Sequence, residues 1–187
     1  MLTSRRALAA ALLLATSLTL PALGALAAGT AGTKSKPAPR RPKITEIRID
    51  KSDHTLQLLA DTQVVKSYKV AIGPGGAGPK LYQGDKRTPV GTYRVQGRIK
   101  GLFHQFLTVS YPNDEDRVRY AESKRRGEIP KGRGIGFGIG IHGVGSPELA
   151  GDHKLSDWTL GCIALDDDEI DEVARLVPDG TRIVITD

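Results

Sequence analysis

The sequence predicts a mainly β domain with a few short helices. Short segments rich in β-branched and other apolar residues recur from residue 44 onward, and glycine, proline and aspartate separate them. Only two stretches are predicted to be helical. Residues 44–187 are long enough to bury the core of one domain and contain no internal repeat, so one domain is expected there.

Seven segments have the apolar pattern of strands. The first contains Ile44, Ile47 and Ile49, and the third ends at a run of glycine and proline at 73–76. In the sixth, residues 135–141, glycine alternates with apolar residues, which predicts a strand with one bare face that a neighbouring strand or an extended peptide can approach. The predicted strands are 44–49, 55–59, 64–72, 92–95, 106–109, 135–141 and 181–185.

Two segments have helical patterns. Residues 116–126 are predicted to be helical, with Asn113 or Asp114 as the N-cap. Residues 166–177 are the clearer case, because Asp166 and Glu169 have the spacing of a capping box and Pro178-Asp179-Gly180 stops the helix. Acidic residues 166–168 at a helix start are explained by the helix dipole without a bound cation.

The first residues have the pattern of a secretory signal peptide. Arg5 and Arg6 form a basic region, residues 7–20 are almost wholly apolar, and Ala25-Leu26-Ala27 is a small-x-small cleavage signal. The apolar run is short for a transmembrane helix, so we expect residues 1–27 to be removed, leaving no stable membrane anchor. The protein is therefore predicted to be exported to the periplasm or cell envelope.

Residues 28–43 are predicted to be a flexible basic linker, because they contain small residues, proline and five basic side chains but no large apolar residue. All 21 acidic residues and 20 of the 27 basic residues lie in 44–187. The net charge of +6 therefore arises from the signal peptide and the linker, and it does not indicate a nucleic-acid-binding face on the folded domain.

Cys162 is the only cysteine, and His142 is the histidine that ends the glycine-rich segment. A lone thiol cannot form an intrachain disulfide, and an imidazole that removes its proton would make it a nucleophile. Gly161 permits a sharp turn before the thiol, and the amides of Gly161 and Cys162 are candidates to hold an oxyanion. Thr159 is a candidate to bind either the local backbone or a substrate. The alternative is a buried cysteine that acts as a small apolar side chain.

Two other site types fit less well. Residues 138–143 match the glycine spacing of a dinucleotide fingerprint, but the glycines fall inside a predicted strand and no long apolar helix follows. A zinc site from His142, His153 and Cys162 lacks the closely spaced ligand pairs of zinc motifs. We therefore expect no metal and no cofactor.

Four segments together resemble the L,D-transpeptidase (YkuD-like) catalytic domain. His142 lies upstream of Thr-Leu-Gly-Cys at 159–162, as in the family pattern of a histidine followed by Ser/Thr-x-Gly-Cys. Residues 84–93, Gly-Asp-Lys-Arg-Thr-Pro-Val-Gly-Thr-Tyr, resemble the family's G-D-x-R-T-P-x-G-x-Y segment, and Ser-Tyr-Pro-Asn at 110–113 with Asp116-Arg117 resembles one of its branches. The resemblance covers residues 43–186 and places a catalytic domain at 44–187.

The resemblance implies a curved β-sandwich and an exported bacterial enzyme that acts on peptidoglycan stem peptides. Cys162 would attack a carbonyl at an L-to-D junction, His142 would move the proton, and an amine acceptor would resolve the thioester. Gly161 and Gly143 would be oxyanion or orienting residues. The side chains implied to bind substrate are Trp158, Thr159 and Tyr111.

Three positions differ from the common family pattern. Leu160 stands where many members have a second histidine, Gly143 where several have serine, and Ala164 where many have arginine or asparagine. A backbone carbonyl would then have to orient His142, and the residues that hold the donor carboxylate are left open. The sequence does not distinguish transfer to a stem peptide, attachment of an envelope protein and hydrolysis. The oligomeric state is also left open. Two segments, 73–84 and 120–134, are candidates for a lid.

Alternatives from other classes were weighed against this resemblance. Papain-like enzymes place cysteine before histidine, the reverse of the order here. A sortase-like enzyme would use His142, Cys162 and an arginine such as Arg175 or Arg182, but the flanks of Cys162 do not fit. A non-catalytic cell-wall-binding module would keep the groove without turnover, and the presence of both His142 and Cys162 disfavours it.

Overall fold

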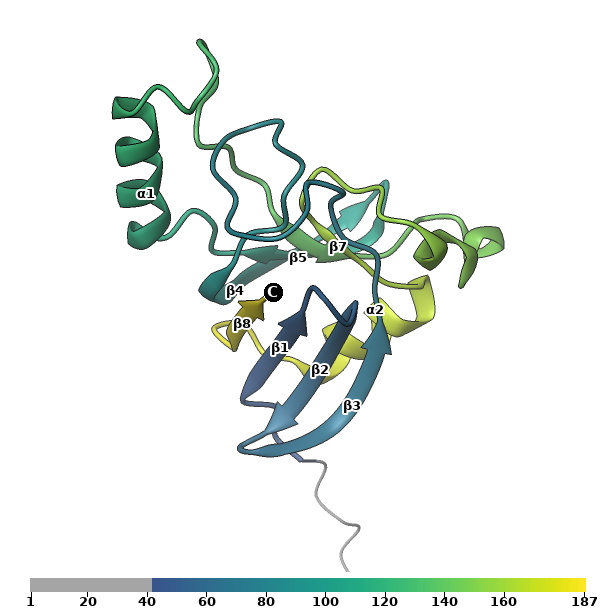
Figure 1. The fold of residues 1–187 in the computed structure, drawn as a ribbon. Helices are drawn as coiled ribbons and strands as arrows, with labels where there is room; N and C mark the ends of the chain where they lie inside the picture. The colour runs from purple at the N-terminus through teal and green to yellow at the C-terminus, as the bar shows by residue number, and fades with distance from the viewer. Residues whose placement is uncertain (1–41) are drawn as a thin grey trace, which may run out of the picture. The chain divides into compact units, whose positions relative to one another are not determined.

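One mixed β-sheet of eight strands organises the chain, and the computed structural model describes residues 42–187 (Figure 1). The predicted signal peptide, 1–27, and nearly all of the predicted linker, 28–43, lie outside the described residues. No helix within residues 42–187 has the length and apolar character needed to cross a bilayer.

The strand order in the sheet is β3-β2-β1-β8-β4-β5-β6-β7. The pairs β1/β8 and β6/β7 are parallel and the remaining neighbours are antiparallel, so the sheet is mixed. The strands are β1 Glu46–Asp50, β2 Thr55–Ala60, β3 Gln63–Lys69, β4 Gly91–Gly101, β5 His104–Val109, β6 Gly140–His142, β7 Ile163–Ala164 and β8 Arg182–Thr186.

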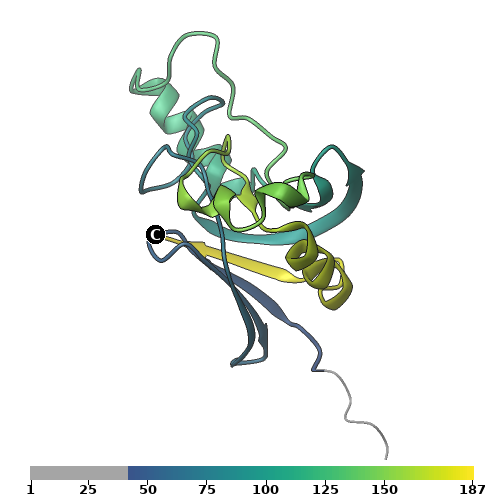
Figure 2. The ribbon, with the colours of Figure 1, turned by 90° about the vertical axis from the view of Figure 1, so that its right-hand side faces the viewer.

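Strand β4 joins two halves of the sheet. Its first residues pair with β8 and its later residues pair with β5, with a register irregularity between Val95 and Gly97. An irregularity of this kind bends a strand and increases its twist. Figure 2 shows the resulting curvature, with β4 passing over the layer formed by β1 and β8. The predicted mainly β fold with a few short helices is confirmed.

The core lies between the inner faces of the sheet and helix α2, Asp167–Leu176. Alternate residues of β1, β2, β5, β8 and the first half of β4 are buried, as the period of two in a strand leads one to expect. The buried pairs are Ile47 and Ile49, Leu56 and Leu58, Tyr93 and Val95, Leu107 and Val109, and Ile183 and Ile185, with Ile170 and Val173 from α2.

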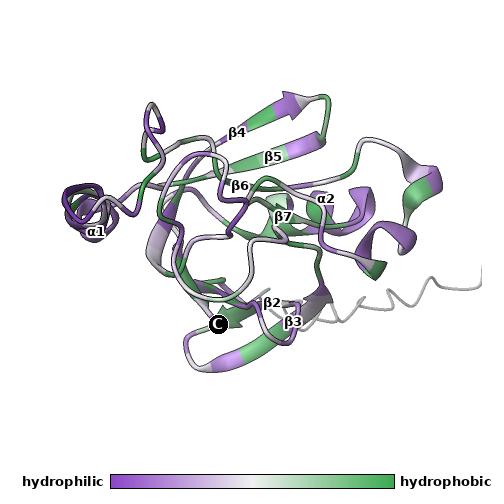
Figure 3. Cartoon of the chain, turned by 45° about the horizontal axis from the view of Figure 1, so that its top comes forward, coloured by the Kyte–Doolittle hydropathy of each residue, from purple (hydrophilic) through white to green (hydrophobic). Residues whose placement is uncertain are grey.

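Both predicted helices form, with the expected caps. Helix α1, Asp114–Arg125, begins after Asn113, whose side chain accepts from the Asp116 amide at 2.9 Å. Helix α2 follows Asp166, whose amide donates to the Glu169 carboxylate at 3.1 Å. Figure 3 shows that α1 is mostly hydrophilic, so it is held by polar contacts such as those of the buried Asp116.

The prediction of a long strand over 135–141 is wrong. Only Gly140–His142 pairs as β6, because Gly136 and Gly138 have φ of 90° and 75°, which no regular strand contains. The close approach expected at a bare face occurs at Gly140, where an added Cβ would lie 2.2 Å from the Phe106 ring. The two-residue strand β7 was not predicted, because a segment so short has no readable period.

Candidate active site

Cys162 lies at the end of a tight turn, residues 157–162, which we call the Cys162 turn. The Thr159 hydroxyl donates to the Cys162 carbonyl at 2.8 Å and accepts from the Gly161 amide at 3.1 Å. Gly161 has φ of 122°, and an added Cβ there would lie 2.6 Å from the Arg87 carbonyl oxygen. Only glycine fits this position, and the turn therefore fixes the backbone at the thiol.

The start of the Cys162 turn is tied to the chain just after β3. The amides of Trp158 and Thr159 both donate to the Ile72 carbonyl at 3.1 Å, and the Asp157 carboxylate accepts from the Ile72 amide at 3.0 Å. His54 Nε2 lies 3.1 Å from both oxygens of the same carboxylate. The turn is thus anchored to the sheet before the chain reaches the cysteine.

The Gly-Asp-x-Arg-Thr-Pro segment supports the other side of the turn. The Asp85 carboxylate accepts from Lys80 Nζ at 2.6 Å and from the backbone amides of Leu81 and Arg87. Arg87 donates back to the Gly75 carbonyl, and the Thr88 hydroxyl accepts from the Gly73 amide. This motif is therefore structural: it folds residues 73–88 into a loop whose Arg87 carbonyl packs against Gly161.

His142 ends β6 and is 2% exposed. Its Nδ1 lies 2.6 Å from the Gly143 carbonyl oxygen. Since a carbonyl only accepts, Nδ1 carries the hydrogen, and Nε2 of the neutral ring holds the free lone pair. The ring is stacked on Phe106 with a centroid distance of 5.6 Å and lies 4.6 Å from the Phe103 ring, so its orientation is fixed by packing as well.

Gly143 is required for a reason that the sequence did not reveal. An added Cβ there would lie 2.3 Å from an Asp167 carboxylate oxygen, which accepts from the amides of Val144 and Gly145 at 2.8 and 3.0 Å. Asp167 belongs to the first turn of α2, where a negative charge is favoured. The helix thus holds the loop whose carbonyl orients His142.

Burial disfavours the charged form of both the thiol and the imidazole. Burial raises the pKa of the Cys162 thiol, although the Gly140 amide and the charge of Lys80 oppose that shift. Burial also lowers the pKa of His142, against the effect of the Gly143 carbonyl. The thiol donates to the Gly138 carbonyl with an Sγ to O distance of 3.6 Å, and no hydrogen bond within residues 42–187 joins it to the imidazole.

Cys162 and His142 line the same cavity, which has a volume of about 500 Å³. The lining contains four aromatic side chains and two basic side chains, Lys80 and Arg133. The lining also includes Leu160 and the backbone of Gly136 and Gly138. The aromatic wall consists of Phe103, Phe106, Phe137 and Trp158.

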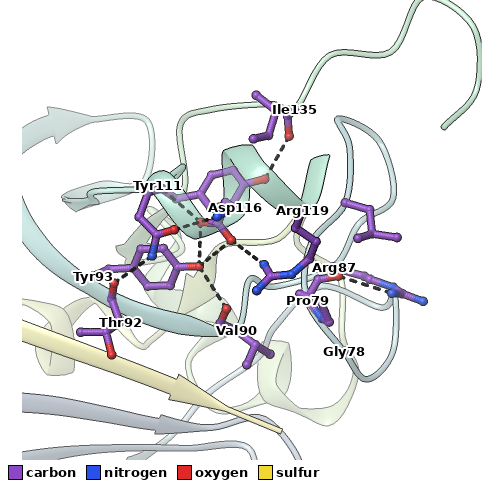
Figure 4. A network of polar contacts seen from close by, with 12 residues as sticks. Gly78, Pro79, Arg87, Val90, Thr92, Tyr93, Tyr111, Asp116, Arg119 and Ile135 are labelled. Atoms are coloured by element: carbon purple, nitrogen blue, oxygen red, sulfur yellow. Dashed lines mark hydrogen bonds and ion pairs between the residues drawn. The ribbon is translucent and has the colours of Figure 1, made fainter. Parts of the chain in front are cut away.

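The three residues expected to bind substrate have different surroundings in the structure. Trp158 lines the cavity and is 40% exposed. Thr159 also lines it, but its hydroxyl is engaged within the Cys162 turn, which is the local role. Tyr111 does not line the cavity: it is buried in the core, and its hydroxyl donates to the Ile135 carbonyl at 3.0 Å (Figure 4). The expectation that Tyr111 contacts substrate is therefore corrected.

The network in Figure 4 explains the motif that contains Tyr111. Asp116 is buried and accepts from the Tyr93 hydroxyl at 3.0 Å, from Arg119 at 2.9 Å and from the Asn113 amide at 3.1 Å. A buried carboxylate must have such partners. The Tyr-Pro-Asn stretch and Asp116 thus dock α1 onto β4, and they serve the fold.

His153, the remaining residue considered for a metal, pairs with Asp166: its Nε2 lies 2.9 Å from the carboxylate. Its ring meets Trp158 edge-on at a centroid distance of 6.3 Å. His153 thus lies behind the aromatic wall and does not line the cavity.

Sequence reasoning missed several cavity residues. Lys80, Gln83 and Arg133 lie in segments marked only as candidate lids, and Phe137 lies in the predicted strand that does not form. Phe137 is 82% exposed, and no sequence period predicts its place in the cavity lining.

Comparison with known proteins places this fold and site in one family. The L,D-transpeptidase catalytic domain (YkuD) model matches residues 44–185, and the chain belongs to this family. The Escherichia coli K12 protein named "Putative L,D-transpeptidase YafK" is 29% identical over 138 residues, which cover 70% of this chain and 46% of that protein.

Solved structures share the fold. The helical cell shape determining protein Pgp2 of Campylobacter jejuni matches with a TM-score of 0.55 at 24% identity, over 76% of this chain and 47% of that chain. An L,D-transpeptidase from Mycobacterium smegmatis matches with a TM-score of 0.50 at 16% identity, over 76% of this chain and 58% of that one. This chain thus spans about half the length of these relatives, and the L,D-transpeptidase fold expected from the sequence is confirmed.

Proposed function

We propose that this chain is an exported peptidoglycan L,D-transpeptidase with Cys162 as nucleophile and His142 as general base. One observation supports this most directly: Cys162 and His142 line the same cavity, and the Gly143 carbonyl leaves Nε2 of His142 as the basic nitrogen. The family membership and the putative transpeptidase among its relatives point the same way.

In the first half-reaction, Nε2 of His142 takes the proton of Cys162 as the thiolate attacks a stem-peptide carbonyl at an L-to-D junction. Since burial disfavours the charged form of each group, we assign the proton transfer to the step in which the sulfur attacks the bound substrate. We assign the oxyanion to the Cys162 amide alone, since the Gly161 amide donates to Thr159. His142 then protonates the departing amine, and a thioester on Cys162 remains.

In the second half-reaction, an amine acceptor replaces the leaving residue. His142 removes a proton from the amine, which attacks the thioester carbonyl, and the Cys162 sulfur leaves and regains its proton. The energy of the original peptide bond is kept in the thioester, so the exchange requires no nucleotide. Water in place of the amine would give hydrolysis and release an amide-linked group from peptidoglycan.

The proposed site of action is the cell envelope. Residues 1–27 have the signal-peptide pattern, and the basic residues of 28–43 give a tether with a positive charge that suits anionic envelope polymers. The proposed partners are peptidoglycan stem peptides, with no nucleic acid among them.

The test is incubation of the purified protein with a disaccharide tetrapeptide, followed by mass analysis of the products. We expect a cross-linked dimer with loss of the terminal residue; a free tripeptide would instead identify the hydrolytic alternative. Cys162→Ala is expected to abolish both products. His142→Gln is expected to lower the rate at least about 100-fold, the usual contribution of a general base.

A carbapenem provides a second measurement that needs no acceptor. We expect a covalent adduct on Cys162 in the wild type and none in Cys162→Ala, read as the mass of the intact protein. A wild-type protein that neither converts the tetrapeptide nor forms the adduct would contradict the proposal and favour a cell-wall-binding module.

A further inference from the structure

The charges that line the cavity are all of one sign. Lys80 and Arg133 line it, and within residues 42–187 no aspartate or glutamate does. Charged clefts with apolar walls concentrate ligands of the opposite charge. The cavity therefore favours an anionic group at its basic end, which we define as Lys80, Gln83, Gly84 and Arg133.

Two loops bring these residues together. The Gln83 amide donates to the Gly134 carbonyl at 2.8 Å, which joins the 80–84 loop to the segment that contains Arg133. An added Cβ on Gly84 would lie 3.5 Å from Arg133 Nη1, and one on Gly136 would lie 3.5 Å from Lys80 Cε. Arg133 thus borders a glycine of the 80–84 loop, and Lys80 borders a glycine of the 133–138 segment.

The two cations differ in how they are held. Lys80 is buried and fixed by Asp85, whose oxygens also accept from the amides of Leu81, Tyr82 and Arg87. The charge of Lys80 reaches the site, because it lowers the pKa of the Cys162 thiol. Arg133 is exposed, and within residues 42–187 its guanidinium forms no ion pair. It is therefore the cation available to a ligand.

The geometry points to a subsite at the basic end of the cavity, in which Arg133, supported by Lys80, binds the free carboxylate of the residue that follows the scissile carbonyl. This inference rests on the proposed function, which supplies the donor peptide and its terminal carboxylate. A guanidinium suits the role, because its planar donors match the two oxygens of a carboxylate. Ala164, beside the Cys162 turn, offers no cation for this purpose.

The kinetic test compares two donor tetrapeptides that differ only at the end: one with a free terminal carboxylate and one with a terminal amide. We expect Arg133→Gln to lower kcat/KM roughly tenfold for the carboxylate donor and to leave the amide donor unchanged, since a charge-assisted hydrogen bond is lost only in the first case. Arg133→Lys should restore part of the loss. The matched control is Lys131→Gln, an exposed cation of the same segment that does not line the cavity.

A binding measurement keeps this inference separate from the proposed catalysis. In a Cys162→Ala background, where no chemistry occurs, the carboxylate donor should bind more tightly than the amide, and Arg133→Gln should remove the difference. A third donor has lysine in place of the diamino acid that carries a side-chain carboxylate. It tests whether Arg133 binds that carboxylate and not the terminal one. Equal binding of the first two donors, or an equal loss for both on Arg133→Gln, would overturn the subsite. Selective binding in this background, together with no turnover by the wild-type protein, would overturn the proposed function instead.

Discussion

The two sides of the cavity are built differently. The Cys162 turn is held by buried partners: Thr159 bridges it internally, and the Ile72 backbone anchors its start. Segment 133–138, which also lines the cavity, contains left-handed glycines and exposes Phe137. Atoms that must keep one geometry for bond making are thus fixed by the fold, whereas the surface suited to recognition is left to side chains that the fold does not need.

The largest loss of stability is expected from a substitution at Gly161, in the Cys162 turn. Gly161→Ala would place a methyl group 2.6 Å from the Arg87 carbonyl at a φ of 122°, so we expect a loss of about 2–4 kcal/mol in the free energy of unfolding. Urea unfolding measures it. Gly180→Ala is the control, because its φ is 83° but nothing lies near the added Cβ; a loss equal to that of Gly161→Ala would show that the close contact is unimportant.

The burial of Cys162 predicts how the alkylation rate of its thiol depends on pH. Because burial raises the pKa of Cys162, the folded protein holds less thiolate than the unfolded chain at any pH below that value. Alkylation by iodoacetamide should therefore have its midpoint at a higher pH in the native protein than in urea. A midpoint below that of the unfolded chain would instead indicate a preformed thiolate and imidazolium pair.

A smaller loss of stability, with no change in turnover, is expected from a substitution at Tyr111. Tyr111→Phe removes the hydrogen bond to the Ile135 carbonyl and leaves that part-buried acceptor without its donor, so we expect a loss of about 1 kcal/mol in stability. Turnover of the tetrapeptide should not change, since the side chain does not line the cavity. A raised KM with unchanged stability would reinstate Tyr111 as a substrate contact.

The smallest effect on stability is expected on the exposed side. Phe137 is 82% exposed, so Phe137→Ala should change the free energy of unfolding by less than about 0.5 kcal/mol. If this side serves recognition, the same variant raises KM while kcat is kept. An unchanged KM together with a loss of stability would show that Phe137 serves the fold and not recognition.

The sequence allowed the strands with clear alternation and both capped helices to be predicted, because period and capping are local properties. The pairing of Cys162 with His142 came from a motif, and the cavity contains both. The functions of Tyr111 and of Asp85 with Arg87 could not be predicted, because a tyrosine or an ion pair is chemically the same in a core and in a binding site. Residues 135–139 do not form the predicted strand, because Gly136 and Gly138 adopt positive φ and the alternation of glycine with apolar residues therefore does not correspond to a β-strand.

Asp167 lies only a few residues after Cys162, and it also holds the loop next to His142. Together with the pairing of His142 with Ala164 in β6 and β7, the short run 162–167 therefore sets where Cys162 lies relative to His142, and an insertion there should displace one from the other. The stretch between them in sequence, 146–156, contains two short 3₁₀ turns, Pro147–Leu149 and Asp152–Leu155, and none of its residues is fully buried. Natural length variation in such domains should accumulate in 146–156, where new residues would alter the surroundings of the cavity and leave the sulfur and the ring in place.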